Sequence, residues 1–194
     1  MKLVVGIDDG GFIPLLKFSK HKPRIPLVAV YYKNYRIIDV IFRSIKIDGL
    51  DGTNKLLSII NRKRPDLILS QGVTFGGFNI IDFVEVNKLT GIPVIVILDR
   101  LPNFERIFTA INKHFKDANK RITIIKKLPK IIKFKDIYYE NIGIEPLKAE
   151  KIIGNLTIFG KIPEPIRLAH LICRSIFNLN KILELEYQSF KIKI

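Results

Sequence analysis

The chain begins with a short apolar run rich in Val and Ile, and further runs with strand character follow it. They span residues 3–7, 25–32, 36–47, 66–70 and 93–98, with a β-like stretch at 131–139. The second and third runs are separated by only three residues, so they predict an antiparallel hairpin. The fourth and fifth are short and almost entirely apolar, which is typical of buried strands.

Between and after these runs the apolar positions change to helical spacing. Such spacing occurs at Leu56, Leu57, Ile59 and Ile60, at Ile80, Ile81, Phe83 and Val84, at Phe104, Ile107, Phe108, Ile111 and Phe115, and within 145–153 and 163–177. We expect the second helix to begin near Phe78, with Gly76 and Gly77 allowing tight entry and Asp82 solvated in mid-helix. The third helix is expected to cover the sheet.

This order predicts an α/β fold with a mixed sheet, in which three antiparallel strands are followed by parallel strands with flanking helices. This order of strands and helices is the one found in a ribonuclease H-like domain. The 194 residues, 47% of them hydrophobic, are most simply one domain over 1–194. No apolar run reaches membrane-spanning length, Met1 leads directly into the first strand, and Cys173 is the single cysteine. We therefore expect a cytoplasmic protein that does not contact a membrane.

A formal net charge of +15 points toward polyanionic partners. The segment 113–135 is densely basic, and within it Lys126, Lys127 and Lys130 meet no acid before Asp136. Lysines that neutralise phosphates give sequence-independent, salt-sensitive binding to nucleic acid. The alternative for any one cluster is a solvated, Lys-rich surface.

Two adjacent carboxylates, Asp8 and Asp9, follow the first strand and precede Gly10 and Gly11. Asp8 is expected at the carboxyl end of a central strand, where open α/β sheets place their ligands. The alternative is that both acids only shape the turn.

The last predicted helix carries a polar stripe beside its apolar face. Glu164, Arg167, His170 and Arg174 follow one another at spacings of three, three and four residues, so they share one side of the helix.

Several motifs together resemble an archaeal family called domain of unknown function ninety-nine. They are Gly6-Ile7-Asp8-Asp9-Gly10, Asp48-Gly49-Leu50-Asp51-Gly52-Thr53, Gly72-Val73-Thr74-Phe75-Gly76-Gly77-Phe78-Asn79, Gly91-Ile92-Pro93-Val94 and residues 163–172. The resemblance covers nearly the whole chain. This family looks like a distant relative of endonuclease V, a ribonuclease H-fold enzyme that cuts nucleic acid near deaminated purines with a divalent metal.

The resemblance implies a metal site for Mg²⁺ or Mn²⁺. Asp8 matches the first carboxylate of endonuclease V, and Gln71 occupies the position where a second is usual. A neutral amide can coordinate through its oxygen but supplies no charge, so the site should be weakened. Asp48 and Asp51 are candidate third ligands, although Asp51 is also placed to cap a helix.

The candidate catalytic residues are accordingly Asp8, Asp48 and His170. Arg167 and Arg174 fit phosphate contact, together with the lysines at 126, 127 and 130. Two functions stay open: a metal-dependent endonuclease-like phosphodiester hydrolase with a weakened active site, and a non-catalytic module that binds DNA or RNA. The second function tolerates Gln71, and metal-dependent cleavage separates the two.

Overall fold

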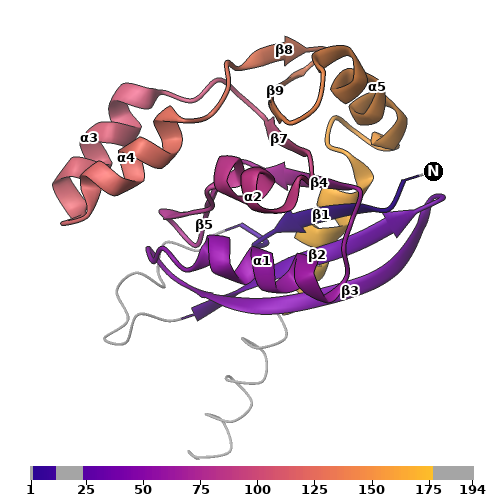
Figure 1. Cartoon of the computed structure of the whole chain (residues 1–194), viewed down its shortest axis with the longest axis horizontal. Helices are drawn as coiled ribbons and strands as arrows, with labels where there is room; N and C mark the ends of the chain where they lie inside the picture. The colour runs from indigo at the N-terminus through magenta and orange to yellow at the C-terminus, as the bar shows by residue number, and fades with distance from the viewer. Residues whose placement is uncertain (1, 12–23, 177–194) are drawn as a thin grey trace, which may run out of the picture.

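The computed structural model describes residues 2–11 and 24–176. Their main element is a sheet with the strand order β3-β2-β1-β4-β7-β9-β8 (Figure 1). Its strands are β1 (Val4–Asp8), β2 (Arg24–Lys33), β3 (Arg36–Lys46), β4 (Leu67–Gln71), β7 (Val94–Leu98), β8 (Ile132–Phe134) and β9 (Ile137–Ile142). Two short strands, β5 (Thr74–Phe75) and β6 (Asn79–Ile80), form a separate hairpin.

The sheet is mixed, as the sequence predicted. β1, β2 and β3 pair antiparallel, whereas β1, β4 and β7 run parallel to one another. β9 and β8 then extend the sheet with antiparallel pairs. The carboxyl ends of the three parallel strands consequently meet at one edge.

The predicted hairpin connects β2 to β3 through a two-residue turn. Lys33 pairs with Arg36, and between them Asn34 and Tyr35 have φ angles of +51° and +59°. Two successive positive φ angles match the twist of the flanking strands, so this turn type joins long strands directly.

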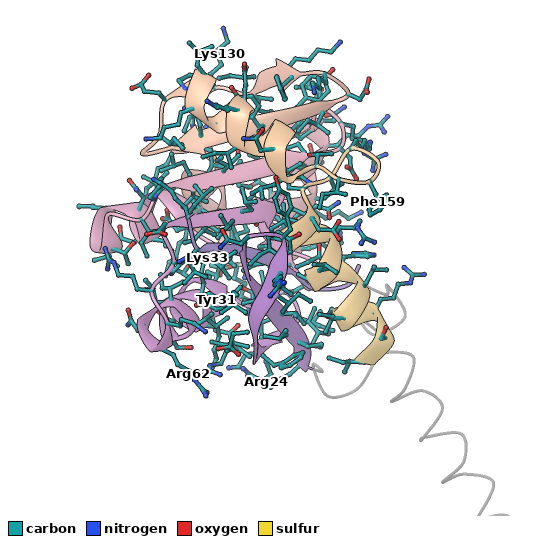
Figure 2. All side chains as sticks on the ribbon, turned by 90° about the vertical axis from the view of Figure 1, so that its right-hand side faces the viewer. Arg24, Tyr31, Lys33, Arg62, Lys130 and Phe159 are labelled. Atoms are coloured by element: carbon teal, nitrogen blue, oxygen red, sulfur yellow. The ribbon has the colours of Figure 1, made fainter. Side chains whose placement is uncertain are left out.

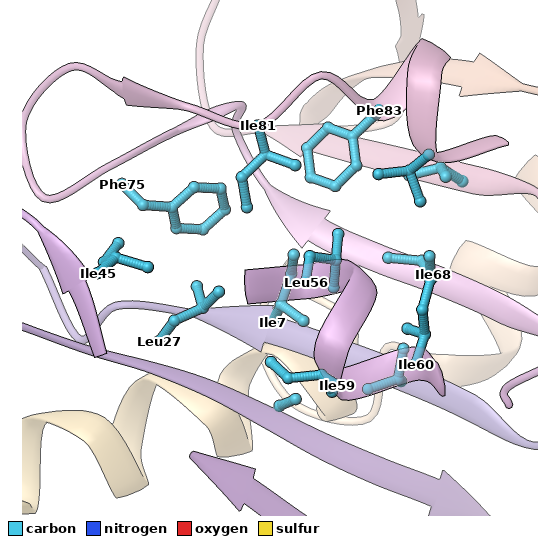
Figure 3. Close-up of a cluster of buried hydrophobic side chains, with 14 of the residues drawn as sticks. Ile7, Leu27, Ile45, Leu56, Ile59, Ile60, Ile68, Phe75, Ile81 and Phe83 are labelled. Carbon is cyan, nitrogen blue, oxygen red and sulfur yellow. The ribbon is translucent and has the colours of Figure 1, made fainter. Parts of the chain in front are cut away.

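The described helices are α1 (Gly52–Arg62), α2 (Phe83–Thr90), α3 (Phe104–His114), α4 (Ala118–Lys126), α5 (Pro146–Leu156) and a final helix, which the structure describes over residues 164–176. Some of them cover the two faces of the sheet. On one face, Leu56 and Ile59 of α1 pack with Ile7, Leu27 and other strand residues (Figure 3). On the other, α5 and the final helix bury residues of β2 and β7.

The expectation that a helix around residues 104–115 covers the sheet is wrong. The apolar cluster to which α3 contributes contains Ile111, Ile124 and Ile125 with Ile80 of β6, and no residue of the seven-stranded sheet. In Figure 1, α3 and α4 extend away from the rest as a pair. We call this pair the α3–α4 lobe. The periodicity identified the helix correctly, but the partner of its apolar face is α4.

A second expectation, a helix beginning near Phe78, is also wrong. Gly76 and Gly77, with φ of +54° and +86°, turn the β5–β6 hairpin instead, and α2 begins only at Phe83. Asp82 is not a solvated mid-helix residue: it is the buried N-cap, and its Oδ1 accepts a hydrogen bond from the Glu85 N–H at 2.9 Å. A capping carboxylate satisfies a donor that the first helical turn leaves unpaired.

Most other predicted elements are present with shifted ends, and the helix predicted over 163–177 corresponds to the final helix. Phe177 lies outside the described residues. In the part of the chain that the structure describes, no helix has the length and apolar character needed to span a bilayer.

Candidate active site

Two glycines allow the final helix to approach β1 closely. A Cβ on Gly6 would lie 2.3 Å from the carbonyl carbon of Pro165 and 2.6 Å from the backbone nitrogen of Ile166. A Cβ on Gly10, whose φ is +74°, would lie 2.8 Å from the backbone nitrogen of Arg174. All three distances are shorter than real Cβ contacts. The glycines therefore fix where the helix starts and where it passes the end of β1.

This fit brings together two predicted site residues that are 162 positions apart. The Nδ1 atom of His170 lies 3.0 Å from Oδ1 of Asp8, at the carboxyl end of β1. The same carboxylate oxygen accepts the Gly10 N–H at 2.5 Å. Asp8 is 5% exposed, whereas the His170 side chain is 34% exposed. A buried carboxylate thus orients a ring whose other nitrogen can reach solvent or a ligand.

The two adjacent acids differ in what they contact. Burial, followed by the charge of Asp9, raises the pKa of Asp8 to about 6, against the opposing effects of the Gly10 N–H and His170. Burial also raises the pKa of Asp9, whose oxygens accept hydrogen bonds from the N–H groups of Gly76 at 2.6 Å and Gly11 at 3.1 Å. Asp9 therefore shapes the turn, whereas Asp8 contacts both the turn and His170, unlike the alternative in which both acids only shape the turn.

Gln71 lies beside Asp8 on the neighbouring strand. Ile7 is in register with Ser70, so the next residues, Asp8 and Gln71, end two parallel strands side by side. The Gln71 amide nitrogen donates to Oδ2 of Asp99 at 3.3 Å. Asp99 directly follows β7 and also pairs with Lys161. A cavity of about 590 Å³ opens here, and its lining includes Gln71, Asp99, Arg100 and Arg106.

Asp48 and Asp51 make hydrogen bonds that hold the loops around β3 and α1. Oδ1 of Asp48 accepts the Phe78 N–H at 2.9 Å, and its own N–H donates to the Gly76 carbonyl. Asp51 occupies the N-cap position of α1 without a capping hydrogen bond from its side chain. The structure thus connects Asp48 to the β5–β6 hairpin, and its role as a metal ligand stays a prediction.

Asp51 uses both of its oxygens for structure. Oδ1 accepts the Lys46 N–H and the Asn79 amide, and Oδ2 pairs with Arg24 at 3.0 Å. Burial alone would raise the pKa of Asp51, but these hydrogen bonds and the nearby charge of Arg24 outweigh it and lower the pKa. The carboxylate is therefore ionised and already paired, and its metal role too stays a prediction.

The predicted phosphate-binding residues have different surroundings. Lys126 and Lys130 are exposed, and Lys130 lies at the opposite end of the molecule from Arg62 in Figure 2. Lys127 forms an ion pair with Asp82 at 3.1 Å. Arg167 makes two hydrogen bonds of 2.7 Å with Glu164, whereas Arg174 on the same helix is exposed. Within the stripe on the final helix, Arg167 is therefore occupied by an ion pair, and Arg174 presents an exposed cation.

One basic residue of the segment 113–135 is structural. Arg121 is 4% exposed; it pairs with Asp117 and donates to the carbonyls of Asp48, Gly49 and Phe78. Its guanidinium therefore joins α4 to the loop before α1 and to the β5–β6 hairpin.

The donor set fits a loosely held Mg²⁺ or Mn²⁺ better than a closed cage. Asp8 offers a buried carboxylate, Gln71 an amide oxygen and Asp99 a second carboxylate. All three lie at the edge of the sheet where the parallel strands end. Mg²⁺ accepts oxygen ligands of this kind and keeps several waters. Within residues 2–11 and 24–176, no group of three or more His, Cys, Asp and Glu side chains is arranged to hold a metal ion.

Two acids of this region were missed by sequence reasoning. Asp99 follows an apolar strand just as Asp8 does, so the same signal could have found it. Glu140 lies in β9, where it pairs in register with Val96 and is 3% exposed. Nothing local in the sequence marks Glu140 as buried, because its burial depends on which strand lies next to β9.

Comparisons with known proteins show relatives of the chain in sequence and in fold. The chain is 39% identical over 180 residues to a UPF0215 protein of Methanocaldococcus jannaschii, covering 91% of this chain and 95% of that one. A protein of unknown function from Archaeoglobus fulgidus has a similar structure, with a TM-score of 0.81 and 30% identity over 91% of this chain and 98% of that one.

Human endonuclease V has the same fold at 13% identity, with a TM-score of 0.59 over 93% of this chain and 86% of that one. The expectation of an uncharacterised archaeal family with an endonuclease V-like fold is confirmed. The model of one family, described as endonuclease dU, matches residues 2–177. The chain therefore belongs to the endonuclease dU family.

Proposed function

We propose that this protein is a metal-dependent endonuclease-like hydrolase of nucleic acid phosphodiesters, with an active site weakened by Gln71. The observation that carries the proposal is the 3.0 Å contact between Asp8 and His170 at the carboxyl end of β1. The family description and the endonuclease V fold support it. Endonuclease V of Ciona intestinalis, at 15% identity, was solved with DNA that contains an inosine followed by a ribo-adenosine.

The chemistry of the site follows from the two residues. When bound, Mg²⁺ or Mn²⁺ would supply charge neutralisation at the phosphate and a more acidic water. Asp8, with Gln71 and Asp99 beside it, would hold the cation. An ionised Asp8 accepts at Oδ1, so Nδ1 of His170 carries the hydrogen and Nε2 is left to take or give a proton at a reacting oxygen.

Gln71 accounts for the weakness of the proposed site. Its amide replaces a negative charge at the strand end next to Asp8, and its nitrogen is directed to Asp99. A cation that meets fewer anionic oxygens is held less tightly at millimolar Mg²⁺. We therefore expect slow cleavage, with Mn²⁺ more effective than Mg²⁺ because it binds nitrogen and oxygen ligands more tightly.

The basic surface would position the strand. Lys126, Lys130 and Arg174 are exposed and are suited to phosphate oxygens. Binding should therefore weaken steeply as salt rises, whatever the sequence.

Nicking of labelled duplex and single-stranded oligonucleotides with one deoxyuridine or one inosine tests the proposal. The native protein should nick slowly and only with Mn²⁺ or Mg²⁺. Asp8→Asn and His170→Ala should each reduce the rate about a hundredfold or more. Asp136→Asn, which changes an exposed carboxylate in the β8–β9 turn, is the matched control and should leave the rate unchanged.

Cleavage that survives Asp8→Asn would contradict the proposed site. The second candidate function, a non-catalytic nucleic-acid-binding module, is favoured by the neutral Gln71 and its contact with Asp99. Salt-sensitive binding without cleavage by either the native protein or a Gln71→Asp variant would establish that alternative.

A further inference from the structure

The outer side of β3 has no neighbouring strand among the described residues. β3 is 11 residues long and ends the seven-stranded sheet on the side remote from β8 (Figure 1). Ile38 and Phe42 on this strand are 47% and 44% exposed. A long outer strand with exposed apolar side chains can pair with a strand of another chain. The proposed reaction does not use this surface.

The register of β3 shows which of its backbone groups point outward. Pro26 of β2 is in register with Ser44 and has no N–H, so the two residues form a non-hydrogen-bonded pair. Pairs of this type recur at every second residue of an antiparallel ladder, so Phe42 and Val40 also direct their N–H and C=O groups away from β2. Both residues therefore offer a donor and an acceptor to a further strand.

Two charged side chains of β3 bond these outward groups. Oδ1 of Asp39 accepts the Val40 N–H at 2.8 Å, and Nη1 of Arg43 donates to the Phe42 carbonyl at 2.8 Å. The remaining contacts of the two side chains lie on the face that α1 covers: Oδ2 of Asp39 pairs with Lys63, and Nε of Arg43 donates to a serine of α1. An acid thus takes the place of a strand carbonyl, and a guanidinium takes the place of a strand N–H.

These positions make β3 complementary to a second copy of itself. In an antiparallel pair with a twofold axis through Ile41, Asp39 of each copy lies opposite Arg43 of the other, because both are two residues from the axis. Val40 lies opposite Phe42 for the same reason. An axis through position 39 would oppose two acids, and one through position 43 would oppose two cations. Opposite charges directly across a strand pair stabilise it, whereas like charges destabilise it.

From this complementarity we propose that the protein forms a dimer in which β3 pairs with β3 of a second copy, antiparallel and about Ile41. Val40 and Phe42 exchange N–H···O=C bonds with the other copy. This exchange releases Oδ1 of Asp39 and Nη1 of Arg43, which then pair with each other across the axis. The other contacts of both side chains are kept. The two sheets, of seven strands each, become continuous.

The opposite face of β3 adds apolar contacts to this dimer. Val40 packs in a cluster with residues of β2 and the final helix, and Phe42 lies on the same face. About the axis, Phe42 is diagonal to Phe42 of the second copy, a separation that aromatic side chains can bridge. A bulge places Ile38 out of register with β2, and Arg24 bonds the Ser44 carbonyl. The new ladder is therefore limited to residues 39–43, and we expect a micromolar dissociation constant.

Sedimentation equilibrium of the full-length protein, free of metal and nucleic acid, tests the dimer. The native protein should convert from monomer to dimer at micromolar concentrations. Asp39→Arg places cations at both positions of a copy, and Arg43→Asp places acids at both. Each variant alone should dimerise about tenfold or more weakly than the native protein, because like charges then meet across the axis. An equimolar mixture of the two restores both opposite pairs and should form a heterodimer.

Two further comparisons assign the effect to the outer side of β3. Asp136→Arg makes the same charge change in the exposed β8–β9 turn and should dimerise as the native protein does. Phe42→Pro removes the outward N–H but no bond to β2, so it should weaken the dimer more than Phe42→Ala does. Circular dichroism identifies temperatures at which each variant is folded.

Three outcomes would overturn the proposal. The first is a native protein that stays monomeric up to about 1 mM, which would leave the outer side of β3 to another occupant. The second is a dimer that neither charge reversal weakens, which would place the contact on another surface. The third is a mixture of the folded Asp39→Arg and Arg43→Asp variants that associates no better than either variant alone.

Discussion

The edge around Asp8 and the α3–α4 lobe are built in opposite ways. At the edge, glycines admit the final helix, and Asp8, Asp9 and His170 all have hydrogen-bond partners. In the lobe, Phe104 is partly exposed, cavities open beside the helices, and Glu140 has an oxygen without a partner.

This difference indicates that the two regions have different roles. Reactive groups need fixed geometry, and a site on rigid strands supplies it. A pocket that admits a ligand needs space and a few polar groups that fix the ligand's orientation. The edge is therefore suited to chemistry and the lobe to recognition. The predictions below test that distinction, in order of decreasing free-energy effect.

Gly6→Ala should have the largest effect, because its Cβ would overlap the backbone of Pro165 and Ile166. The final helix would have to move away from β1, which also separates His170 from Asp8. We expect the free energy of unfolding to fall by about 4 kcal/mol. Urea denaturation measures this.

Gly154→Ala is the matched control for that change. A Cβ at this helical position of α5 meets nothing within 4 Å, so alanine should stabilise the protein by up to about 1 kcal/mol. Equal responses of the two glycine variants would show that the edge is not closely packed.

Glu140 should make the stability of the protein depend on pH. The folded state keeps its proton up to about pH 7, whereas the unfolded chain releases it near 4.5. Between these values the folded state binds more protons, so the free energy of unfolding should fall by up to about 3 kcal/mol as pH rises. Burial is what raises the pKa of Glu140, although the cations Lys126 and Lys130 line the same cavity.

Chemical denaturation between pH 4.5 and 8 measures this slope. Glu140→Leu should be flatter than the native protein and more stable at pH 8, since no charge is then buried. An identical slope in both proteins would mean that Glu140 is solvated and would remove the contrast between the two regions.

Gln71→Asp should strengthen cation binding at the edge around Asp8. The added carboxylate beside Asp8 should create Mg²⁺-dependent nicking or raise it about tenfold or more, which corresponds to about 1.4 kcal/mol. The double variant with Asp8→Asn should lose the gain. Robust native cleavage that the change does not improve would show that another acid, with Asp99 or Asp48 the first candidates, already completes the site.

The smallest effects are expected from single lysines. Lys126→Ala and Lys130→Ala should each lower the affinity for unmodified single strands severalfold and reduce the slope against log salt by about one. Lys127 is paired with Asp82, so Lys127→Ala should change binding less. Fluorescence anisotropy at several salt concentrations distinguishes the three variants. Equal losses from all three would show that the ion pair with Asp82 does not withhold Lys127 from nucleic acid.

The sequence predicted the edge better than the lobe for a physical reason. The apolar run before Asp8 and the helical spacing around His170 are both visible in neighbouring residues of the sequence, so both residues could be identified. Their contact depends on Gly6, whose need for close approach is visible only once the helix is placed. Asp82 was misread because capping depends on where the helix starts, and Ile80 of β6 continues the helical spacing of Ile81, Phe83 and Val84.

The lobe was predicted poorly because its partners are distant in sequence. The apolar stripe of α3 was visible, but its partner depends on where α4 lies, and α4 is tied by Arg121 to Gly49 and Phe78, which are distant in sequence. Glu140 was missed because strand alternation does not show which neighbour covers a side chain.

Paramagnetic broadening of histidine resonances by Mn²⁺ tests the central claim, that Asp8 and His170 form a cation-dependent site, most directly. The chain has 3 histidines, and His114 at the end of α3 serves as the internal reference. We expect the His170 ring signals to broaden at substoichiometric Mn²⁺ while those of His114 stay sharp, and Asp8→Asn to abolish the difference. Equal broadening of both residues, or selective broadening of His170 that persists in Asp8→Asn, would contradict the account.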